Sequence, residues 1–337
     1  MMRVISLGLI SAVAVFAQSD AITRGLEAFH RGDYVSAERE LVKSPDPRAR
    51  TFLALTMAAT GRCDAAGTEL AKTFESGEET LRRMSGLALV QCDLAKDRMD
   101  DAAAVVSKLK AQYPADPDVL YQSARVSMRA WNQTIHQLYE KAPSSFRVNQ
   151  ISAEILETQG HFSEATVEYR KAIEKNPKAL NLHFRLGRAL LMSSHAPEML
   201  DGAIKEFEAE LVLNPSDFVA EYQAGQVLLA QEKPDAAGPR MQRALALNPD
   251  FLEALIGLGK LRLDEKKNDE AIALLQRAVK LSPRSESAHY SLMLAYRNAG
   301  NLAAARKEKG ELDQLQKAPE GEFTEFLKKL GEKPPQK

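Results

Sequence analysis

Apolar side chains recur every three to four residues along most of this chain, with polar residues between them. One such stripe is formed by three residues of one segment: Ile272, Leu275 and Val279. This spacing is the period of an amphipathic helix rather than of a strand. Residues 216–231 and 234–247 are predicted to be two helices joined by a short turn, and Asn248-Pro249 closes the pair because the residue before a proline disfavours helical angles. The pattern predicts an all-α chain of helical hairpins.

The hairpin pattern returns every 34 residues. An alanine in each predicted second helix keeps this spacing, apart from one interval of 38: Ala165, Ala203, Ala237, Ala271 and Ala305. A proline lies 12 residues after most of these alanines: Pro177, Pro215, Pro249 and Pro283. A small residue precedes them by 12 residues, or by 16 in the unit with the long interval: Ala153, Gly187, Gly225 and Gly259. Four extra residues are therefore expected between Gly187 and Ala203, most simply within 193–197.

This pattern resembles the tetratricopeptide repeat family, whose 34-residue helical hairpins stack into a right-handed superhelix. The small residue, the alanine and the closing proline all match, and so does a large residue four positions after the alanine: Tyr169, Phe207, Met241 and Leu275. The early tryptophan of the family is absent, and other residues stand in its place: Asn149, His183, Glu221 and Leu255. The resemblance implies an all-α, right-handed superhelical solenoid of stacked helix-turn-helix repeats.

Towards both ends the repeat becomes irregular, which divides the chain into four parts. We expect a signal peptide at 1–17, degenerate repeats at 18–145, regular repeats at 146–309, and a capping helix with a flexible tail at 310–337. The apolar residues of the expected capping helix, at 322–330, keep a helical spacing: Phe323, Phe326, Leu327 and Leu330. Residues 117–142 are expected to form two helices in poor register.

The first residues are typical of an export signal. Arg3 is the only charge before Asp20, and the segment between them is apolar up to the small residue Ala17. This stretch is shorter than the roughly 20 residues of a membrane span and fits a secretory signal peptide. We therefore expect an exported protein, periplasmic or secreted, with no transmembrane segment after signal cleavage.

Composition and motifs narrow the function by exclusion. Lys+Arg 45 and Asp+Glu 46 nearly cancel, whereas a nucleic-acid-binding surface requires excess cations. No phosphate-binding loop, catalytic serine turn or metal-ligand pair is found in the sequence, and Gly257-Leu258-Gly259 fits helix packing better than a dinucleotide loop. We expect no cofactor, no metal, no nucleic-acid partner and no enzymatic activity.

The two cysteines are expected at the same edge of the solenoid. Cys63 begins a predicted second helix and Cys92 lies late in the next first helix. Because adjacent helices run antiparallel and an exported protein meets oxidising conditions, these residues can form a disulfide. Two buried, reduced thiols are the alternative, and the sequence leaves both open.

In the tetratricopeptide family the first helix of each repeat lines a concave groove, and its exposed positions carry the ligand. Carrying those positions over gives the candidate groove residues: Tyr121, Arg125, Gln150, Glu154, Phe184, Arg188, Tyr222, Gln226, Lys260, Tyr290 and Arg297. Amides, cations and rings together suit an extended peptide. The resemblance implies a non-catalytic protein-interaction scaffold. The alternative is an envelope-assembly or carbohydrate-processing protein that uses the groove as a ligand cleft.

Overall fold

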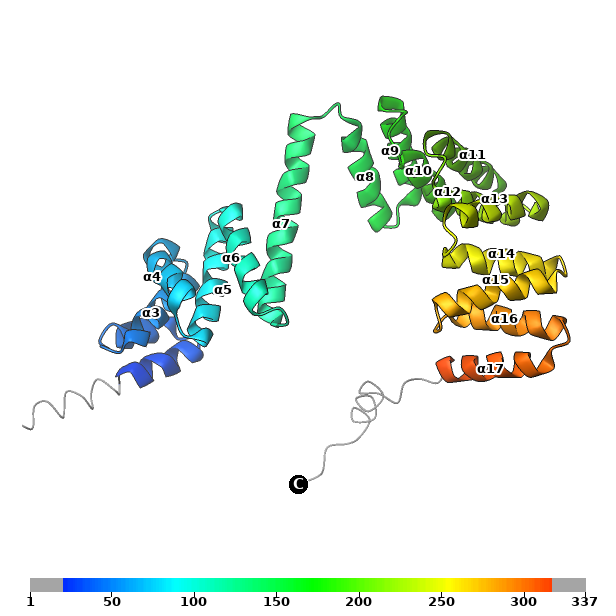
Figure 1. Cartoon of the computed structure of the whole chain (residues 1–337). Coiled ribbons are helices and arrows are strands. Elements are labelled where there is room, and N and C mark those ends of the chain that lie inside the picture. Colours follow the sequence, from blue (N-terminus) through cyan, green and yellow to red (C-terminus); the bar gives the residue numbers. More distant parts are fainter. Residues whose placement is uncertain (1–20, 317–337) are drawn as a thin grey trace, which may run out of the picture. The chain divides into compact units, whose positions relative to one another are not determined.

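The computed structural model of the chain describes residues 21–316, and these residues contain helices and turns but no strand. The described residues fold as two compact units, 21–141 and 142–316. Each unit is a stack of antiparallel helical hairpins (Figure 1). The predicted all-α solenoid of helix-turn-helix repeats is thus confirmed. The expected signal peptide and capping helix lie outside the described residues, and the four-part division of the chain stays a prediction.

The first unit contains seven helices among its described residues. They are a helix over residues 21–30, α2 (Tyr34–Leu41), α3 (Pro47–Ala59), α4 (Cys63–Ser76), α5 (Glu79–Ala95), α6 (Met99–Gln112) and α7 (Pro117–Lys141). The expectation of two helices within 117–142 is wrong, because α7 is one continuous helix of 25 residues. After Pro117 it contains no glycine or proline that could end a helix in its middle.

The second unit contains ten described helices in five hairpins. They are α8 (Phe146–Thr158), α9 (Phe162–Lys175), α10 (Leu182–Ser193), α11 (Pro197–Leu213), α12 (Phe218–Ala230), α13 (Pro234–Leu247), α14 (Leu252–Asp264), α15 (Asn268–Leu281), α16 (Glu286–Asn298) and α17 (Leu302–Gln316). The four extra residues predicted before Ala203 mostly lengthen a helix: α11 has 17 residues, whereas α13 has 14.

In seven of the eight described hairpins the turn contains one residue in the left-handed backbone region, and the turn between α10 and α11 is the exception. Seven residues occupy it, each five positions before the repeat alanine: Gly32, Gly61, Asp97, Gly160, Glu232, Lys266 and Gly300. At Gly160 (φ 78°) the Gly160 N–H donates to the Glu157 carbonyl at 3.0 Å, and the His161 N–H donates to the Leu156 carbonyl at 2.9 Å. This is the Schellman hydrogen-bond pair that ends a helix. The turns therefore share one geometry, although three of the seven residues are not glycine.

The repeat alanines and small residues form the contact between paired helices. Ala165, Ala203, Ala237 and Ala271 are fully buried. A Cβ on Gly187 would lie 2.8 Å from Phe207 Cε1, so the ring occupies the space that a side chain would need. Gly225 is close to Met241 and Gly259 to Leu275 in the same way. The glycines predicted to permit close approach therefore do so.

Polar pairs stand where the family has its tryptophan. In four hairpins a hydrogen-bonded polar pair joins the first helix to the second. The pairs are Asn149 with Glu168, His183 with Glu206, Glu221 with Arg240, and His289 with Glu308, with hydrogen bonds of 2.6, 2.6, 3.2 and 2.7 Å. Burial acts to raise the pKa of Glu168, but hydrogen bonds from Lys171 and Asn149 outweigh it and the pKa is lowered. Charge-assisted hydrogen bonds thus replace an aromatic contact.

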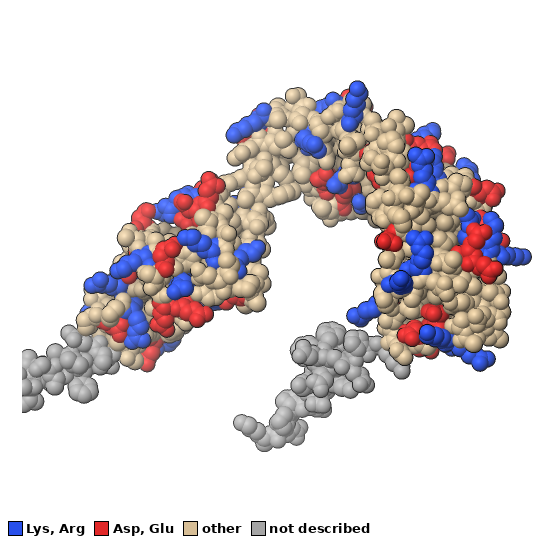
Figure 2. Space-filling view, in the orientation of Figure 1, with Lys and Arg blue, Asp and Glu red and all other residues tan. Residues whose placement is uncertain are grey.

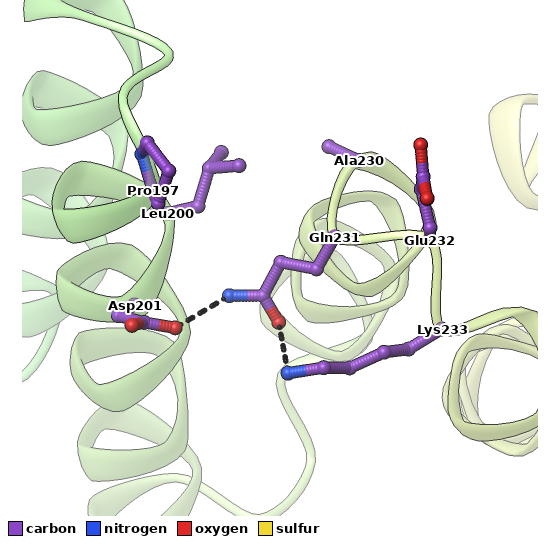
Figure 3. A pocket seen from close by; sticks show the side chains of 7 residues that line it. All are labelled: Pro197, Leu200, Asp201, Ala230, Gln231, Glu232 and Lys233. Carbon is purple, nitrogen blue, oxygen red and sulfur yellow. Dashed lines mark hydrogen bonds between the residues drawn. The ribbon is translucent and has the colours of Figure 1, made fainter.

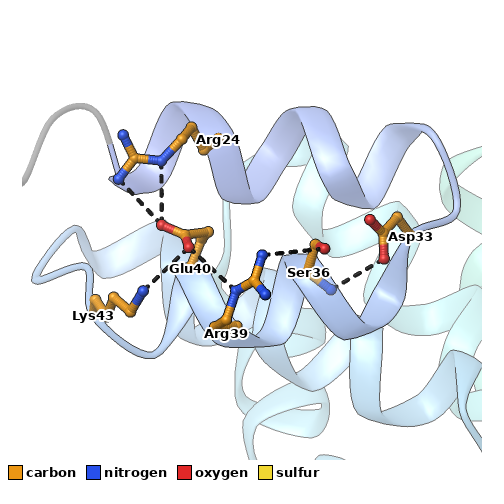
Figure 4. A network of polar contacts seen from close by, with 6 residues as sticks. All are labelled: Arg24, Asp33, Ser36, Arg39, Glu40 and Lys43. Atoms are coloured by element: carbon orange, nitrogen blue, oxygen red, sulfur yellow. Dashed lines mark hydrogen bonds and ion pairs between the residues drawn. The ribbon is translucent and has the colours of Figure 1, made fainter.

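Cys63 and Cys92 form a disulfide that joins the start of α4 to α5 in the first unit. Both residues are buried. Elsewhere in this unit, Glu40 accepts hydrogen bonds from Arg24 and Lys43, and Asp33 caps α2 through the Ser36 N–H (Figure 4). Within residues 21–316, no helix has the length and apolar character needed to span a membrane.

Candidate protein-binding surface

All eleven candidate groove residues lie on first helices of hairpins or on α7, but they belong to two units. Tyr121 and Arg125 lie on α7 in the first unit, with the Arg125 guanidinium 5.9 Å from the Tyr121 ring centroid. The other nine lie on α8, α10, α12, α14 and α16 of the second unit. The first helix α14 contacts the next first helix, α16, as well as its own partner α15. The side of the stack formed by the first helices is therefore the closely packed side in that part of the unit. We restrict the candidate surface to these nine residues.

Aromatic rings form the middle of this surface. The Tyr222 and Phe251 rings meet edge to face with centroids 5.2 Å apart, and Phe218 contacts Phe251 at 5.0 Å. Gly257 lies beside them, since a Cβ there would be 3.1 Å from both Tyr222 Cε2 and Gln226 Nε2. Burial and the nearby Glu253 charge raise the pKa of Tyr222. Tyr222 and Gln226 are therefore fixed in position before any partner arrives.

Two further aromatic residues of this surface, Phe218 and Phe251, were not predicted from the sequence. Both lie at the start of a first helix, Phe218 as the first residue of α12 and Phe251 as the N-cap of α14. Their spacing of 33 residues departs from the 34-residue period. Only the packing of α12 against the start of α14 brings the three rings together.

A chain of polar contacts occupies the surface over α8 and α10. Arg147 donates to Gln150 Oε1 at 2.6 Å, and Gln150 Nε2 donates to Glu154 Oε1 at 3.0 Å. Arg185 follows at 3.6 Å from Glu154 and 3.7 Å from Glu157. Burial, followed by the Glu157 charge, raises the pKa of Tyr169 underneath. Gln150 and Glu154 are thus already partnered, and a ligand would have to displace these contacts.

Among the remaining candidates, Phe184 is half-buried, with its ring centroid 5.6 Å from that of Phe207, and the other four are exposed and weakly partnered. Arg188 and Arg297 make no ion pair within residues 21–316, and Lys260 donates only to Ser287 Oγ, at 3.2 Å. The Tyr290 side chain is 50% exposed. By contrast, Arg240 on a second helix pairs with both Glu208 and Glu221. Arg188, Lys260 and Arg297 can therefore bind a carboxylate of a partner without breaking an existing ion pair.

The hollows on the second unit have different characters. One of ≈ 370 Å³ is lined by a candidate residue and its neighbours: Met293, Arg297, Leu302, Ala305, Arg306 and Lys309. Another, of ≈ 310 Å³, lies between α11 and the α12–α13 turn and contains none of the candidates (Figure 3). There Gln231 donates to Asp201 at 2.9 Å and accepts from Lys233 at 3.0 Å. Its polar groups are satisfied by one another, so we do not assign it a ligand.

The charge on the visible surface is mixed. Lysine and arginine side chains alternate with aspartate and glutamate over both units, without a broad area of one sign (Figure 2). The part of the chain that the structure describes also contains no group of three or more histidine, cysteine, aspartate or glutamate residues placed to hold a metal ion.

Comparison with known proteins identifies the repeats. Residues 222–286 and 259–319 match the tetratricopeptide repeat family. No curated protein matches the sequence. The crystal structure of MamA is similar at 23% identity, covering 51% of this chain and 91% of that chain with a TM-score of 0.47. MamA 41-end from Desulfovibrio magneticus RS-1 has 20% identity, 52% and 97% coverage and a TM-score of 0.48. YrrB, described as a TPR protein with an unusual peptide-binding site, has 24% identity, 58% and 97% coverage and a TM-score of 0.46.

Proposed function

This chain is a tetratricopeptide repeat protein, and we propose that it is an exported, non-catalytic scaffold that binds a protein or peptide partner on the first helices of its second unit. A repeat fold of this kind is typical of protein–protein interaction. The observation that carries the proposal is the row of exposed, weakly partnered groups beside a fixed aromatic cluster. Arg188, Lys260 and Arg297 lie on either side of Tyr222 along α10 to α16.

The chemistry of this row favours an extended acidic peptide. Rings that are already packed present an apolar face without losing side-chain freedom, and exposed cations can form charge-assisted hydrogen bonds to carboxylates. Gln226, held beside Tyr222, adds an amide that can pair with a peptide backbone.

Selection of peptides on the intact chain tests this surface. A phage-displayed library of random 12-residue peptides would be selected on the immobilised protein, and the recovered peptides measured by fluorescence anisotropy. The double substitution Arg188→Ala/Lys260→Ala is expected to raise Kd about tenfold or more, because losing 1.4 kcal/mol of charge-assisted hydrogen bonding is about tenfold. Lys205→Ala/Lys280→Ala, which removes two exposed cations from second helices α11 and α15, is the matched control. Equal loss in both variants, or a library that yields no binder, would contradict the proposal.

The export part of the proposal has its own support and test. A disulfide such as Cys63–Cys92 persists in oxidising compartments and is rare in the cytosol. The apolar segment that ends at Ala17 predicts a mature chain beginning at Gln18. Intact mass and N-terminal sequencing of protein from the exporting cell would reveal this cleavage. An unprocessed chain with two free thiols would contradict export.

A further inference from the structure

Helix α7 is the one first helix of the described chain without a second helix beside it. Every later first helix packs against its own partner, as α8 does against α9 and α14 against α15. In the described part of the first unit, α7 packs mainly against α6 and, less extensively, α5. Figure 1 shows these two helices alongside the first part of α7, while its later turns extend past them. The hairpin that α7 should begin is therefore incomplete.

The face of α7 towards α5 and α6 is short. Val119, Gln122 and Val126 are its only buried residues. Further along the same face the contacts become polar, with Arg129 and Gln133 donating to Asp97 at 3.1 and 3.0 Å. By comparison, seven of the 13 residues of α14 are buried. Beyond Val126, α7 thus has no buried residue.

The opposite face of α7 carries an apolar stripe. Its members are spaced alternately three and four residues apart: Tyr121, Ala124, Met128, Trp131, Ile135 and Leu138. At 100° per residue the stripe lies about 180° from the packed face. Tyr121, Met128 and Trp131 are 62%, 63% and 49% exposed, and Ile135 and Leu138 are half-buried. The spacing is the seam of a two-helix packing, where apolar residues repeat every 3.5 residues.

Comparison with a complete hairpin identifies what this face normally contacts. Val119 and Val126 occupy the positions of Ala254 and Leu261 in α14, which are buried in the same way. In that register Ala124 takes the place of Gly259, the residue that packs against Leu275 of α15. The stripe is therefore the surface on which a second helix would pack, and Ala124 is the small residue at the point of close contact.

We propose that α7 of a second copy of this chain fills that place, with the two helices antiparallel about a two-fold axis at Trp131. An antiparallel neighbour is what each complete hairpin supplies to its first helix. In this register Ala124 faces Leu138 of the other copy, Met128 faces Ile135, and Trp131 faces its equivalent. The contact of the small Ala124 with the large Leu138 occurs twice, once on each side of the axis, as a two-fold interface requires.

The charges along α7 do not oppose a second copy. No aspartate or glutamate occurs between Asp118 and Glu140. The antiparallel register places Arg125 beside the ring of Tyr139 of the other copy rather than beside another cation, so like charges do not meet. The other described helices of the first unit already have partners within their own hairpins. Within residues 21–141, no spare helix is left to cover the stripe.

The mass of the intact protein and the emission of its one tryptophan test the interface. Sedimentation of the full chain should give twice the mass of one copy, and Trp131 emission should shift to shorter wavelength as the dimer forms. Met128→Glu/Ile135→Glu should give a monomer with unchanged far-UV circular dichroism and red-shifted emission. Val212→Glu, at a side chain on α11 that is 79% exposed, is the control and should remain dimeric.

A single introduced thiol tests the register, since both native cysteines are bonded. Asn132→Cys should oxidise to a covalent dimer across the axis, whereas Gln137→Cys on the far side of α7 should not. A monomeric wild-type chain would overturn the proposal whether Trp131 emission is red-shifted (an open face) or blue-shifted (a face covered by the same chain). A dimer that survives Met128→Glu/Ile135→Glu would also overturn it.

Discussion

Gly259 on α14 packs directly against Leu275 on α15, and a Cβ at position 259 would lie 2.7 Å from Leu275 Cγ. Leu275 is fully buried and belongs to a cluster with Ala271, Leu292 and Ala295. The branch point of a buried leucine cannot swing aside as the end of a flexible chain could. The same contact joins Gly187 to Phe207 and, in the first unit, Gly25 to Leu41. Hairpin closure therefore depends on the missing side chain.

Gly259→Ala should lower stability despite alanine's better helix propensity. Overpacking a buried contact typically costs about 1–3 kcal/mol, which exceeds the roughly 1 kcal/mol gained by replacing glycine within a helix. Thermal unfolding followed by circular dichroism measures the effect as a lower Tm. Gly310→Ala is the control, because Gly310 lies in α17 and a Cβ there would meet nothing within 4 Å, so this substitution should raise the Tm. Two substitutions of the same sign would contradict this account.

At turn residues with positive φ, the reverse substitution, to glycine, is expected to stabilise the protein. Glu232 and Lys266 have φ of 58° and 61°, where a side chain is strained and glycine is not. Glu232→Gly and Lys266→Gly should therefore stabilise the second unit by about 1 kcal/mol each. Gly160→Ala, at φ 78°, should destabilise it by a similar amount. Urea unfolding curves distinguish these outcomes, and a loss of stability in both glycine variants would mean that the turns are not strained.

The hairpins could be predicted from the sequence because their determinants are local and repeated. The residues Ala237, Gly225 and Pro249 recur at one spacing, and each has a direct geometric role in its own hairpin. The turns with positive φ could be predicted only where glycine occupies them, as at Gly160. Asp97, Glu232 and Lys266 give no such signal, since their conformation is imposed by the helices on either side.

The candidate surface was harder to predict because it depends on contacts between repeats. The position of Tyr222 follows from its repeat register, but its contact with Phe251 requires the packing of one hairpin on the next. Glu154 looks available in sequence and is instead bonded by Gln150. The continuity of α7 was also missed, because a degenerate repeat pattern favours two helices there although the segment lacks a residue that ends one.

Removal of the Cys63–Cys92 disulfide should destabilise the first unit. The bonded residues are separated by 29 positions, and closing a loop of this size in the unfolded chain is typically worth about 3–4 kcal/mol. The Cys63→Ser/Cys92→Ser variant, or reduction of the native chain, should make residues 21–141 more sensitive to limited proteolysis. The second unit provides the internal control, since its fragments should be unchanged. Equal sensitivity of both units would contradict a local effect of the bond.

The first unit should also be the more sensitive to acid. Its carboxylates with lowered pKa are mostly bonded to arginine or lysine: Asp33, Glu38, Glu40, Asp46, Asp64 and Asp116. A hydrogen bond from Arg83, at 2.6 Å, and then one from the Val119 N–H lower the pKa of Asp116. A lowered folded-state pKa adds stability above the unfolded-state pKa of about 4 and loses it as the pH falls through the folded value.

The Asp116→Asn variant isolates one of these groups. It should be less stable than the wild type at neutral pH, because Arg83 loses its ion pair with the carboxylate at the start of α7. The difference in stability should shrink as the pH falls below about 4. Tm values measured by circular dichroism between pH 7 and pH 3 give both curves. Asp100→Asn, which changes an exposed carboxylate without an ion pair or side-chain hydrogen bond among the described residues, should follow the wild-type curve. A constant offset between Asp116→Asn and the wild type at every pH would show that the Asp116 charge does not stabilise the fold.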